Sequence, residues 1–382
     1  MNHTWHMTLV FWVSLITLVY IYVGYPLLVW GLARVFGREP RRATITPTVS
    51  LLIPAYNEEA YIEEKLRNSL ALRYPSDRLE IVVASDGSTD RTDQLARGFR
   101  SQGVKVLTMR DHLGKAELLA RTVPLLKGDI VVFSDVSSRL VPNALRTLVR
   151  NFADQRVGCV SGLYRLRRAK DLRSQGEGLY WRYETFIKRH ESRLHSILGA
   201  HGAFYAVRRA LISRLEATSI NDDYLIPMRI IEQGYRAVYE PRAVAWEQER
   251  SSVRGEFARR RRIAVGNCQQ VWLLRRLLNP FKVGLVAVSF FSHKVLRTLA
   301  PLLMVSLLAS SAWLPHRWAV VVVGGQLLFY LSALIGYVCQ RRGWSVVWLS
   351  PPLYFCLGNL AMLAGLVKFC LNPTRPAWER AR

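Results

Sequence analysis

The sequence lacks the cysteine patterns of a disulfide framework or a zinc site. Its 382 residues include five cysteines, none of them in a CxxC pair, and three of the five fall in apolar stretches. An odd number in such places suggests neither bridge pairing nor zinc ligation. The phosphate-binding patterns GxGxxG and GxxxxGKS/T are also missing. Neither a dinucleotide site nor a P-loop ATPase is therefore supported.

Charged side chains are absent from four long stretches, which run from Met7 to Ala33, Thr298 to His316, Trp318 to Gln340 and Gly343 to Val367. About 20 apolar residues cross a bilayer as a helix, so each stretch is long enough to span. The pattern predicts a transmembrane anchor over residues 1–34, three transmembrane helices within 298–370, and a C-terminal tail over 371–382.

Residues 280–297 differ from the four apolar stretches because they carry basic side chains. His293, Lys294 and Arg297 alternate there with apolar residues. Such a mixture is typical of a helix that lies at the membrane surface. We therefore expect an interfacial amphipathic helix that leads into the second span.

The first apolar stretch has no basic residue before it and no small-residue cleavage site after it, which favours a retained anchor over a signal peptide. Four arginines follow it instead: Arg34, Arg38, Arg41 and Arg42. Basic residues next to a span favour the cytoplasmic side, so we expect the inner (plasma) membrane with the catalytic domain in the cytoplasm. Counting spans puts the C-terminus outside, whereas Lys368 and the arginines of the tail favour inside, so the topology of the last segment stays open.

The net charge is +25. In a soluble protein this would suggest nucleic acid, but arginines beside anionic inner-leaflet lipid explain it better here. An anionic substrate would also benefit. Membrane lipids are therefore expected partners and nucleic acid is not, while the oligomeric state is open.

Residues 48–279 are dense in charge and follow a linker over 35–47. Short β-rich runs alternate there with helical patterns: strands near 49–54, 79–85, 104–109 and 129–135, and helices near 56–72, 90–100 and 115–126. Fully apolar strands that alternate with helices predict a parallel sheet covered on both faces. The expected fold class is α/β.

Polar residues gather where these strands end. Asp86 and Asp135 each follow a run of apolar residues, and Lys115 opens the third helix. Ligands of open α/β sheets bind at the carboxyl ends of the strands, so these residues predict a site for a polar, phosphorylated ligand. Each acid could instead be a helix cap or a turn residue.

Seven motifs occur in order from Thr48 to about Trp272: IPAYNEE, SDGSTD, HLGKA, FSDVSS, GAHGAFYAVRR, INDDYLIPMRI and RRRRIAVGN. Together they resemble the family 2 glycosyltransferases of the GT-A fold, in the membrane branch of cellulose, chitin and hyaluronan synthases. The resemblance implies a mostly parallel, Rossmann-like sheet and transfer of a sugar from a UDP-sugar, with Mg²⁺ or Mn²⁺ on the diphosphate.

The resemblance also implies a role for particular residues. The positions that match the nucleotide-sugar site are Ala55, Tyr56, Glu58, Asp86, Lys115 and Asp135, and Asp135 also matches the metal ligand. Asp223 matches the general base, with Asp222 as support, and Arg262 matches the arginine of QxxRW. His201 and Gly202 lie where an acceptor could bind. A carboxylate that takes the proton of an acceptor hydroxyl typically contributes about 10²–10⁴-fold to the rate. Structural alternatives remain: helix capping for the two acids, a structural histidine, and a lipid-facing basic surface for residues 259–262.

Two motifs depart from the family pattern. The DxD motif reads Asp135-Val136-Ser137, and a neutral hydroxyl is a poorer metal ligand than a carboxylate, so diphosphate oxygens and water would have to complete the shell. Ile263 stands where processive synthases have the tryptophan of QxxRW. We therefore expect limited transfer to a lipid-linked or other membrane-associated acceptor. Processive polysaccharide synthesis and a non-catalytic scaffold or nucleotide-sugar sensor are the alternatives.

Overall fold

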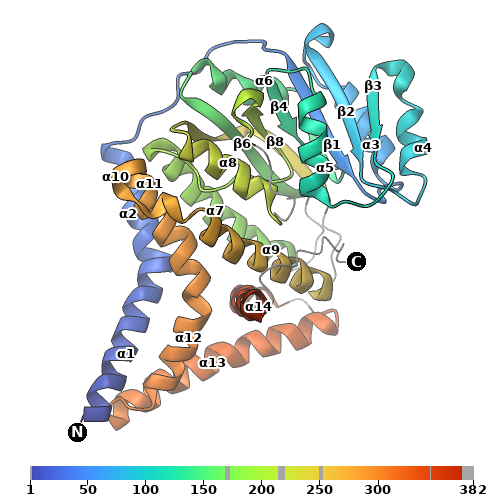
Figure 1. Ribbon diagram of the computed structural model, residues 1–382. Coiled ribbons are helices and arrows are strands. Elements are labelled where there is room, and N and C mark those ends of the chain that lie inside the picture. The colour runs from blue at the N-terminus through green and yellow to red at the C-terminus, as the bar shows by residue number, and fades with distance from the viewer. Residues whose placement is uncertain (1, 168–172, 214–219, 249–252, 345, 372–382) are drawn as a thin grey trace.

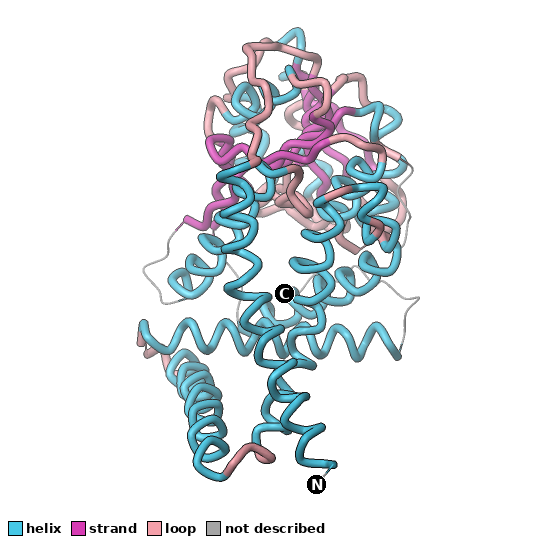
Figure 2. Tube along the Cα trace, turned by 90° about the vertical axis from the view of Figure 1, so that its left-hand side faces the viewer, coloured by secondary structure: helices cyan, strands magenta, loops and turns pink. Residues whose placement is uncertain are grey.

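The computed structural model describes residues 2–167, 173–213, 220–248, 253–344 and 346–371. An α/β domain forms the upper part of the molecule and long helices extend below it (Figures 1 and 2). The tail predicted over 371–382 lies, apart from Leu371, outside the described residues.

One sheet of eight strands forms the centre of the domain, in the order β3-β2-β1-β4-β7-β6-β8-β5. Its strands are β1 (Val49–Ala55), β2 (Leu79–Ser85), β3 (Val104–Thr108), β4 (Ile130–Phe133), β5 (Ser138–Leu140), β6 (Val157–Arg167), β7 (Tyr205–Arg208) and β8 (Arg236–Gln248). The pairs β1–β2, β2–β3, β1–β4 and β6–β8 are parallel, whereas β7 and β5 pair antiparallel with their neighbours. The mostly parallel sheet of an α/β fold is confirmed.

Both faces of the sheet are buried, as the apolar strands predict. Along β1, Leu51 and Ile53 pack into the core on one face, whereas Leu52 packs into the core on the other. The first core is covered by α3 (Ile62–Leu70), α4 (Thr92–Arg97) and α6 (Ala144–Val149), and the second by α5 (Lys115–Thr122) and α8 (Asp222–Glu232). Side chains alternate between the faces of a strand, so a fully apolar strand needs both layers of helices.

Two helices lie between the sheet and the long helices below: α7 (Arg173–Leu194) and α9 (Val253–Leu273). The long helices are α1 (Asn2–Val19), α2 (Tyr25–Val35), α12 (Arg297–Ser311), α13 (His316–Arg341) and α14 (Ser350–Leu371). Two short helices, α10 (Pro280–Val283) and α11 (Leu285–Ser289), precede α12, and π-helical turns lie at Tyr20–Gly24 and Phe290–Leu296. Residues 37–48 connect α2 to β1 without helix or strand.

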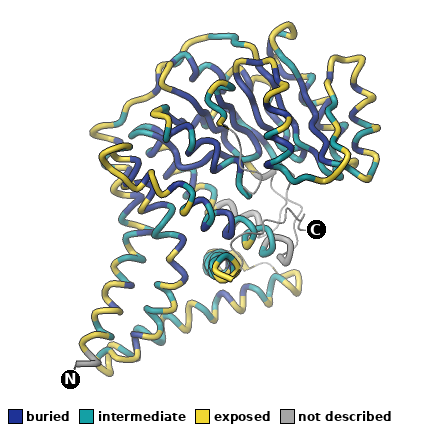
Figure 3. The backbone as a smooth tube through the Cα atoms, in the orientation of Figure 1, coloured by how far each residue is buried: buried dark blue, intermediate teal, exposed yellow. Residues whose placement is uncertain are grey.

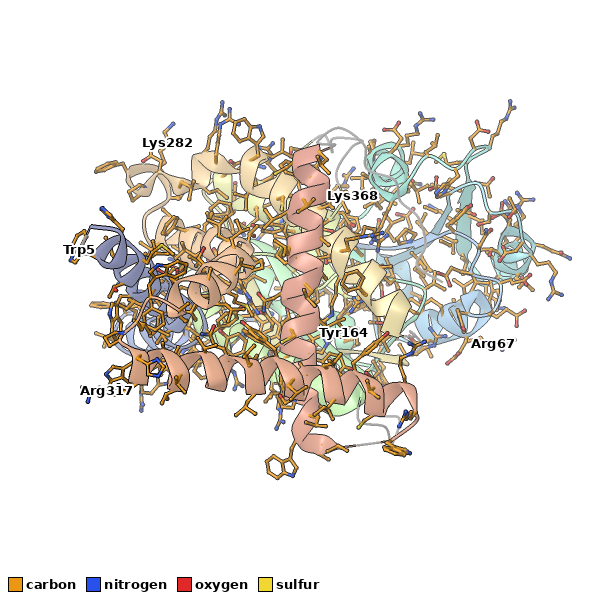
Figure 4. The ribbon with its side chains drawn as sticks, turned by 90° about the horizontal axis from the view of Figure 1, so that it is seen from below. Trp5, Arg67, Tyr164, Lys282, Arg317 and Lys368 are labelled. Atoms are coloured by element: carbon orange, nitrogen blue, oxygen red, sulfur yellow. The ribbon has the colours of Figure 1, made fainter. Side chains whose placement is uncertain are left out.

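Four stretches of the described chain are long and apolar enough to cross a membrane: Trp5–Val35, Leu285–Ser311, His316–Arg341 and Val347–Leu371. Most of their surface is exposed or half-buried, in contrast to the sheet (Figure 3). The helix α1 packs on α12, whereas α14 packs on α9 and α13. Seen from below, α14 runs crosswise to α13 (Figure 4).

The second candidate span, Leu285–Ser311, includes most of the residues for which the sequence predicts a separate surface helix. Instead of a separate helix over 280–297, α10 ends at Gly284 (φ 57°), and one continuous helical stretch runs from Leu285 to Ser311. The basic residues that suggested an interface lie against acids of α7: His293 Nδ1 is 2.7 Å from Glu191 Oε1, and Arg297 pairs with Glu184. Pairing with these acids lets the polar side chains lie inside the protein, which the sequence pattern does not reveal.

Candidate functional site

The ends of β1 and β2 are tied together by their loops. Asn57 adopts a positive φ of 52°, and its side-chain oxygen accepts a hydrogen bond from Thr89 N at 2.8 Å. Glu58 N donates to Thr92 Oγ1 at 2.7 Å. Ala55 is buried at the strand end, and the Tyr56 ring stacks on His112 with centroids 3.9 Å apart. This wall of the site is therefore held by hydrogen bonds between the loops that follow β1 and β2.

Asp86 is fully buried and holds the loop that follows β3. Its two carboxylate oxygens accept hydrogen bonds from Leu113 N and Gly114 N, both at 2.9 Å, and His112 Nδ1 lies 2.9 Å from Oδ2. Gly87 must be glycine, because its φ is 66° and a Cβ would lie 2.6 Å from the Asp111 carbonyl carbon. Asp86 thus positions the segment that leads into Lys115, and its contact with a nucleotide stays a prediction.

Lys115, the first residue of α5, joins acids from two other elements. Its Nζ lies 3.3 Å from Asp135 Oδ1 and 3.2 Å from Asp222 Oδ1. Burial alone would lower the pKa of this ammonium, but the surrounding carboxylates, Asp135 first, raise it above its ordinary value. Three strand-end and helix-end residues that are distant in sequence therefore meet, as the sequence predicted for a site at the carboxyl ends of the strands.

Asp222 and Asp223 open α8 and point to different partners. Asp222 accepts a hydrogen bond from Tyr205 Oη at 3.1 Å and faces Lys115. Asp223 Oδ2 accepts one from Gly202 N at 3.0 Å. Burial and the negative charge of Asp222 raise the pKa of Asp223 to about 6, although Lys115 and Lys188 oppose the shift. A carboxylate with such a pKa is ionised near neutral pH and is a stronger base than a free aspartate.

Gly202 and the residues before it bind Asp223 through their backbone N–H groups. Ala200 N donates to the Asp223 carbonyl oxygen at 2.8 Å, and the buried Lys188 Nζ binds the carbonyls of Gly199 and Ala200 at 3.0 and 3.3 Å. A Cβ at Gly202 would lie 3.0 Å from Asp223 Oδ2. The glycine is therefore explained by its close approach to the acid, and its predicted acceptor contact remains untested.

Asp135 follows β4, and its side chain is 40% exposed, so a ligand can reach it. Oxygen donors suit Mg²⁺ and Mn²⁺, and Asp135 offers carboxylate oxygens that Lys115 contacts from one side. Within the described residues, no group of three or more His, Cys, Asp or Glu side chains could hold a metal by itself. The residues thus fit a metal that shares its shell with a diphosphate, with Asp135 as a protein ligand.

Arg262 on α9 lies near enough to the same acids for their charges to act on its pKa. Burial and the neighbouring Arg259 lower its pKa, whereas Asp223, Asp135 and Asp222 act in the opposite direction. The charges of all three acids therefore reach this guanidinium. Arg262 is placed where it could bind an anionic group next to Lys115.

His201 lies behind Asp223 in an aromatic pocket. Its ring centroid is 5.2 Å from Trp181 and 6.3 Å from Tyr164. Burial and the nearby Lys188 hold its pKa well below the ordinary value, and Nε2 has no hydrogen-bond partner among the described residues. The sequence reading missed Trp181 and Tyr164 as site residues. The aromatic face of the helix predicted near 177–196 was the one signal for Trp181 in the sequence. The sequence does not reveal that this face lies close to His201.

The described structure brings the main predicted residues to one edge of the sheet. Lys115, Asp135, Asp222, Asp223 and Arg262 form one charged cluster. Asp86 and Tyr56 lie on the adjoining wall and connect to the cluster through residues 112–115.

The match to a protein-family model covers residues 47–266 and is described as "Glycosyltransferase like family 2". A probable glycosyltransferase of Bacillus subtilis, YdaM, is 30% identical over 248 residues. The poly-beta-1,6-N-acetyl-D-glucosamine synthase of Staphylococcus aureus is 25% identical over 240 residues. These alignments cover 62% and 61% of this chain, and 59% and 57% of the two relatives.

One solved structure is similar over nearly the whole chain. It is the mannosyltransferase PcManGT of Pyrobaculum calidifontis, in complex with GDP-Man and Mn²⁺. The TM-score is 0.70 at 25% sequence identity, and the match covers 95% of this chain and 99% of the other.

The fold and the strand-end acids define a GT-A transferase domain. The chain belongs to the glycosyltransferase family 2, because the family model matches more than half of its length. The resemblance inferred from the seven sequence motifs is confirmed.

Proposed function

We propose that the protein is an inverting glycosyltransferase that moves a sugar from a UDP-sugar to a hydroxyl of a membrane-associated acceptor, lipid-linked or polysaccharide. The main support is the position of Lys115, which lies between Asp135 and Asp222 next to Asp223. A basic group for the diphosphate and a base for the acceptor are thus provided by one cluster.

In the proposed reaction the acceptor oxygen attacks the anomeric carbon from the side opposite the diphosphate. The new C–O bond forms as the bond to the diphosphate breaks, UDP leaves with the electron pair, and the hydroxyl proton passes to Asp223. Lys115 and Arg262 stabilise the negative charge that develops on the diphosphate. A divalent metal, when bound at Asp135, supplies further neutralisation of that charge.

The donor is identified by a panel of labelled sugars. Membranes that contain the full chain are incubated with labelled UDP-sugars and with GDP-mannose, since the similar structure binds GDP-Man. Each incubation is run with and without EDTA. The proposal predicts transfer from a UDP-sugar, loss of transfer with EDTA, and transfer slowed by about 10²–10⁴-fold with Asp223→Asn. Transfer from GDP-mannose alone would refute UDP as the donor nucleotide.

Processive polymerisation is the second candidate. Although Ile263 replaces the tryptophan of QxxRW, Trp181 and Tyr164 place other aromatic rings near His201, and aromatic rings can stack on sugars. The size of the labelled product separates the two candidates: an organic-soluble product supports limited transfer, and a large water-soluble polymer supports processive synthesis. A scaffold or sensor would give no product from any donor, and the convergence of three acids and Lys115 counts against it.

We also propose that the protein lies in the plasma (inner) membrane with its catalytic domain in the cytoplasm. The four arginines that follow the first apolar helix support this orientation. The α/β domain, on the same side as those arginines, would then meet soluble nucleotide sugars.

A further inference from the structure

The turn that contains Asp135 meets the end of β8, which is distant in sequence. The strand β5 pairs antiparallel with β8, and Ser138 is the direct partner of Glu247. Next to this pair, Ser137 Oγ donates a hydrogen bond to Glu247 Oε1 at 2.5 Å. A carboxylate from β8 therefore lies directly beside Ser137, the residue that holds the position of the second acid of the DxD pattern.

We propose that Glu247 supplies the second carboxylate of the metal site that Ser137 cannot provide. This inference rests on the proposed function, because it assigns a residue to the metal that assists departure of the diphosphate. Glu247 is only partly buried, so a cation can approach it. Asp135 and Glu247 together give two anionic oxygen donors, the kind that Mg²⁺ and Mn²⁺ prefer.

The buried Lys65 holds the turn that contains Asp135. Its Nζ, fully inaccessible to solvent, donates to Ser134 Oγ at 2.7 Å and to the carbonyl and hydroxyl oxygens of Ser138 at 2.9 and 3.0 Å. Burial and Arg139 lower its pKa to about 7, whereas Asp135 and Glu247 both act to raise it. The Lys65 side chain thus fixes Ser134 and Ser138, the residues on either side of the segment that carries Asp135 and Ser137.

The surrounding charges explain why two acids are tolerated here. Lys115 contacts Asp135 from one side, and Lys65 lies behind the turn. The Ser137 hydroxyl keeps Glu247 in place through its hydrogen bond. Outer hydrogen bonds of this kind orient metal ligands. In this arrangement Ser137 does not bind the metal itself but orients Glu247, which does.

Mn²⁺ affinity tests the assignment independently of transfer activity. The purified full chain is titrated into Mn²⁺, alone and with UDP or GDP, and free Mn²⁺ is measured from its EPR signal. Glu247→Gln should weaken Mn²⁺ binding by at least about tenfold. The double variant Ser137→Asp/Glu247→Gln restores the DxD acid and should recover the affinity. Glu64→Gln is the control, because Glu64 is an exposed acid that pairs with the neighbouring Arg139 at 2.7 Å.

Unchanged Mn²⁺ affinity in Glu247→Gln would overturn the proposal. A double variant that binds Mn²⁺ as weakly as the single variant would also overturn it, because an acid at position 137 can replace a metal ligand but not a purely structural role of Glu247. Size-exclusion profiles and nucleotide binding without metal verify that each variant is folded. A wild type that transfers sugar but binds no Mn²⁺ with either nucleotide would refute this metal site and leave the transferase function standing.

Discussion

Replacement of Asp223 by asparagine tests the proposed base with little change in shape. Asparagine keeps a side-chain oxygen that can accept the hydrogen bond from Gly202 N, now 3.0 Å long, but it cannot take a proton. Loss of a general base costs about 10²–10⁴-fold in rate, which corresponds to about 3–5 kcal/mol of activation free energy. We expect kcat to fall by that factor at pH 7.5 while donor affinity changes little.

The pH dependence gives a second, sharper criterion. Since the pKa of Asp223 is about 6, wild-type activity should be constant above about pH 7 and fall tenfold for each unit below about pH 5.5. Asp223→Asn should lose this acid limb. Initial rates of labelled-sugar transfer between pH 4.5 and 8.5 measure both profiles.

Protein stability separates loss of the base from loss of the fold. The folded pKa of Asp223 lies above its ordinary value of 3.8, so the folded state binds this proton more tightly than the unfolded state. The resulting stabilisation is complete below about pH 4 and is lost as the pH rises through 6. At pH 7.5 Asp223→Asn should therefore be at least as stable as wild type. A stable variant that retains more than a tenth of wild-type activity, or the same acid limb, would refute Asp223 as the base.

Three further predictions follow from the neighbouring contacts. Lys115→Met removes a positive charge that lowers the pKa of Asp223, so the acid limb should move up by about one unit, and donor binding should weaken; an unmoved limb would contradict this. Gly202→Ala places a Cβ 3.0 Å from Asp223 Oδ2 and should reduce kcat by about tenfold, whereas Gly31→Ala, where nothing lies within 4 Å, should have no effect. A reporter fused to the C-terminus should report the cytoplasm, because α14 packs along α9 beneath the α/β domain (Figure 1); an external signal would mean that α14 crosses the membrane.

Much of the fold followed from local pattern. The strands β1, β2 and β4 carry apolar side chains on both of their faces, and both faces must be buried. This pattern predicts a parallel sheet between two layers of helices. The polar residues after those strands could be placed at one edge for the same reason. The pairing of Lys115 with Asp135 agrees with that expectation.

The second span was harder to delimit. The sequence placed basic residues in its first half and thereby suggested a membrane-surface helix, but His293 and Arg297 pair with Glu191 and Glu184 on α7 inside the protein. A hydropathy pattern treats every charged residue as unfavourable in an apolar environment, because it contains no information about ion-pair partners. The partner here is about a hundred residues away along the chain.

The sequence by itself determined the α/β class, the four apolar stretches and the order of the family motifs, because these depend on side-chain periodicity and on spacing along the chain. Only the tertiary structure decided that Asp86 binds the backbone of the loop after β3, that Lys115 joins Asp135 to Asp222, and that Glu247 lies beside Ser137. The last contact joins residues 110 positions apart. This contact depends on the order of the strands in the sheet. The strand order is set by the free energy of the whole sheet and not by the sequence of any one strand.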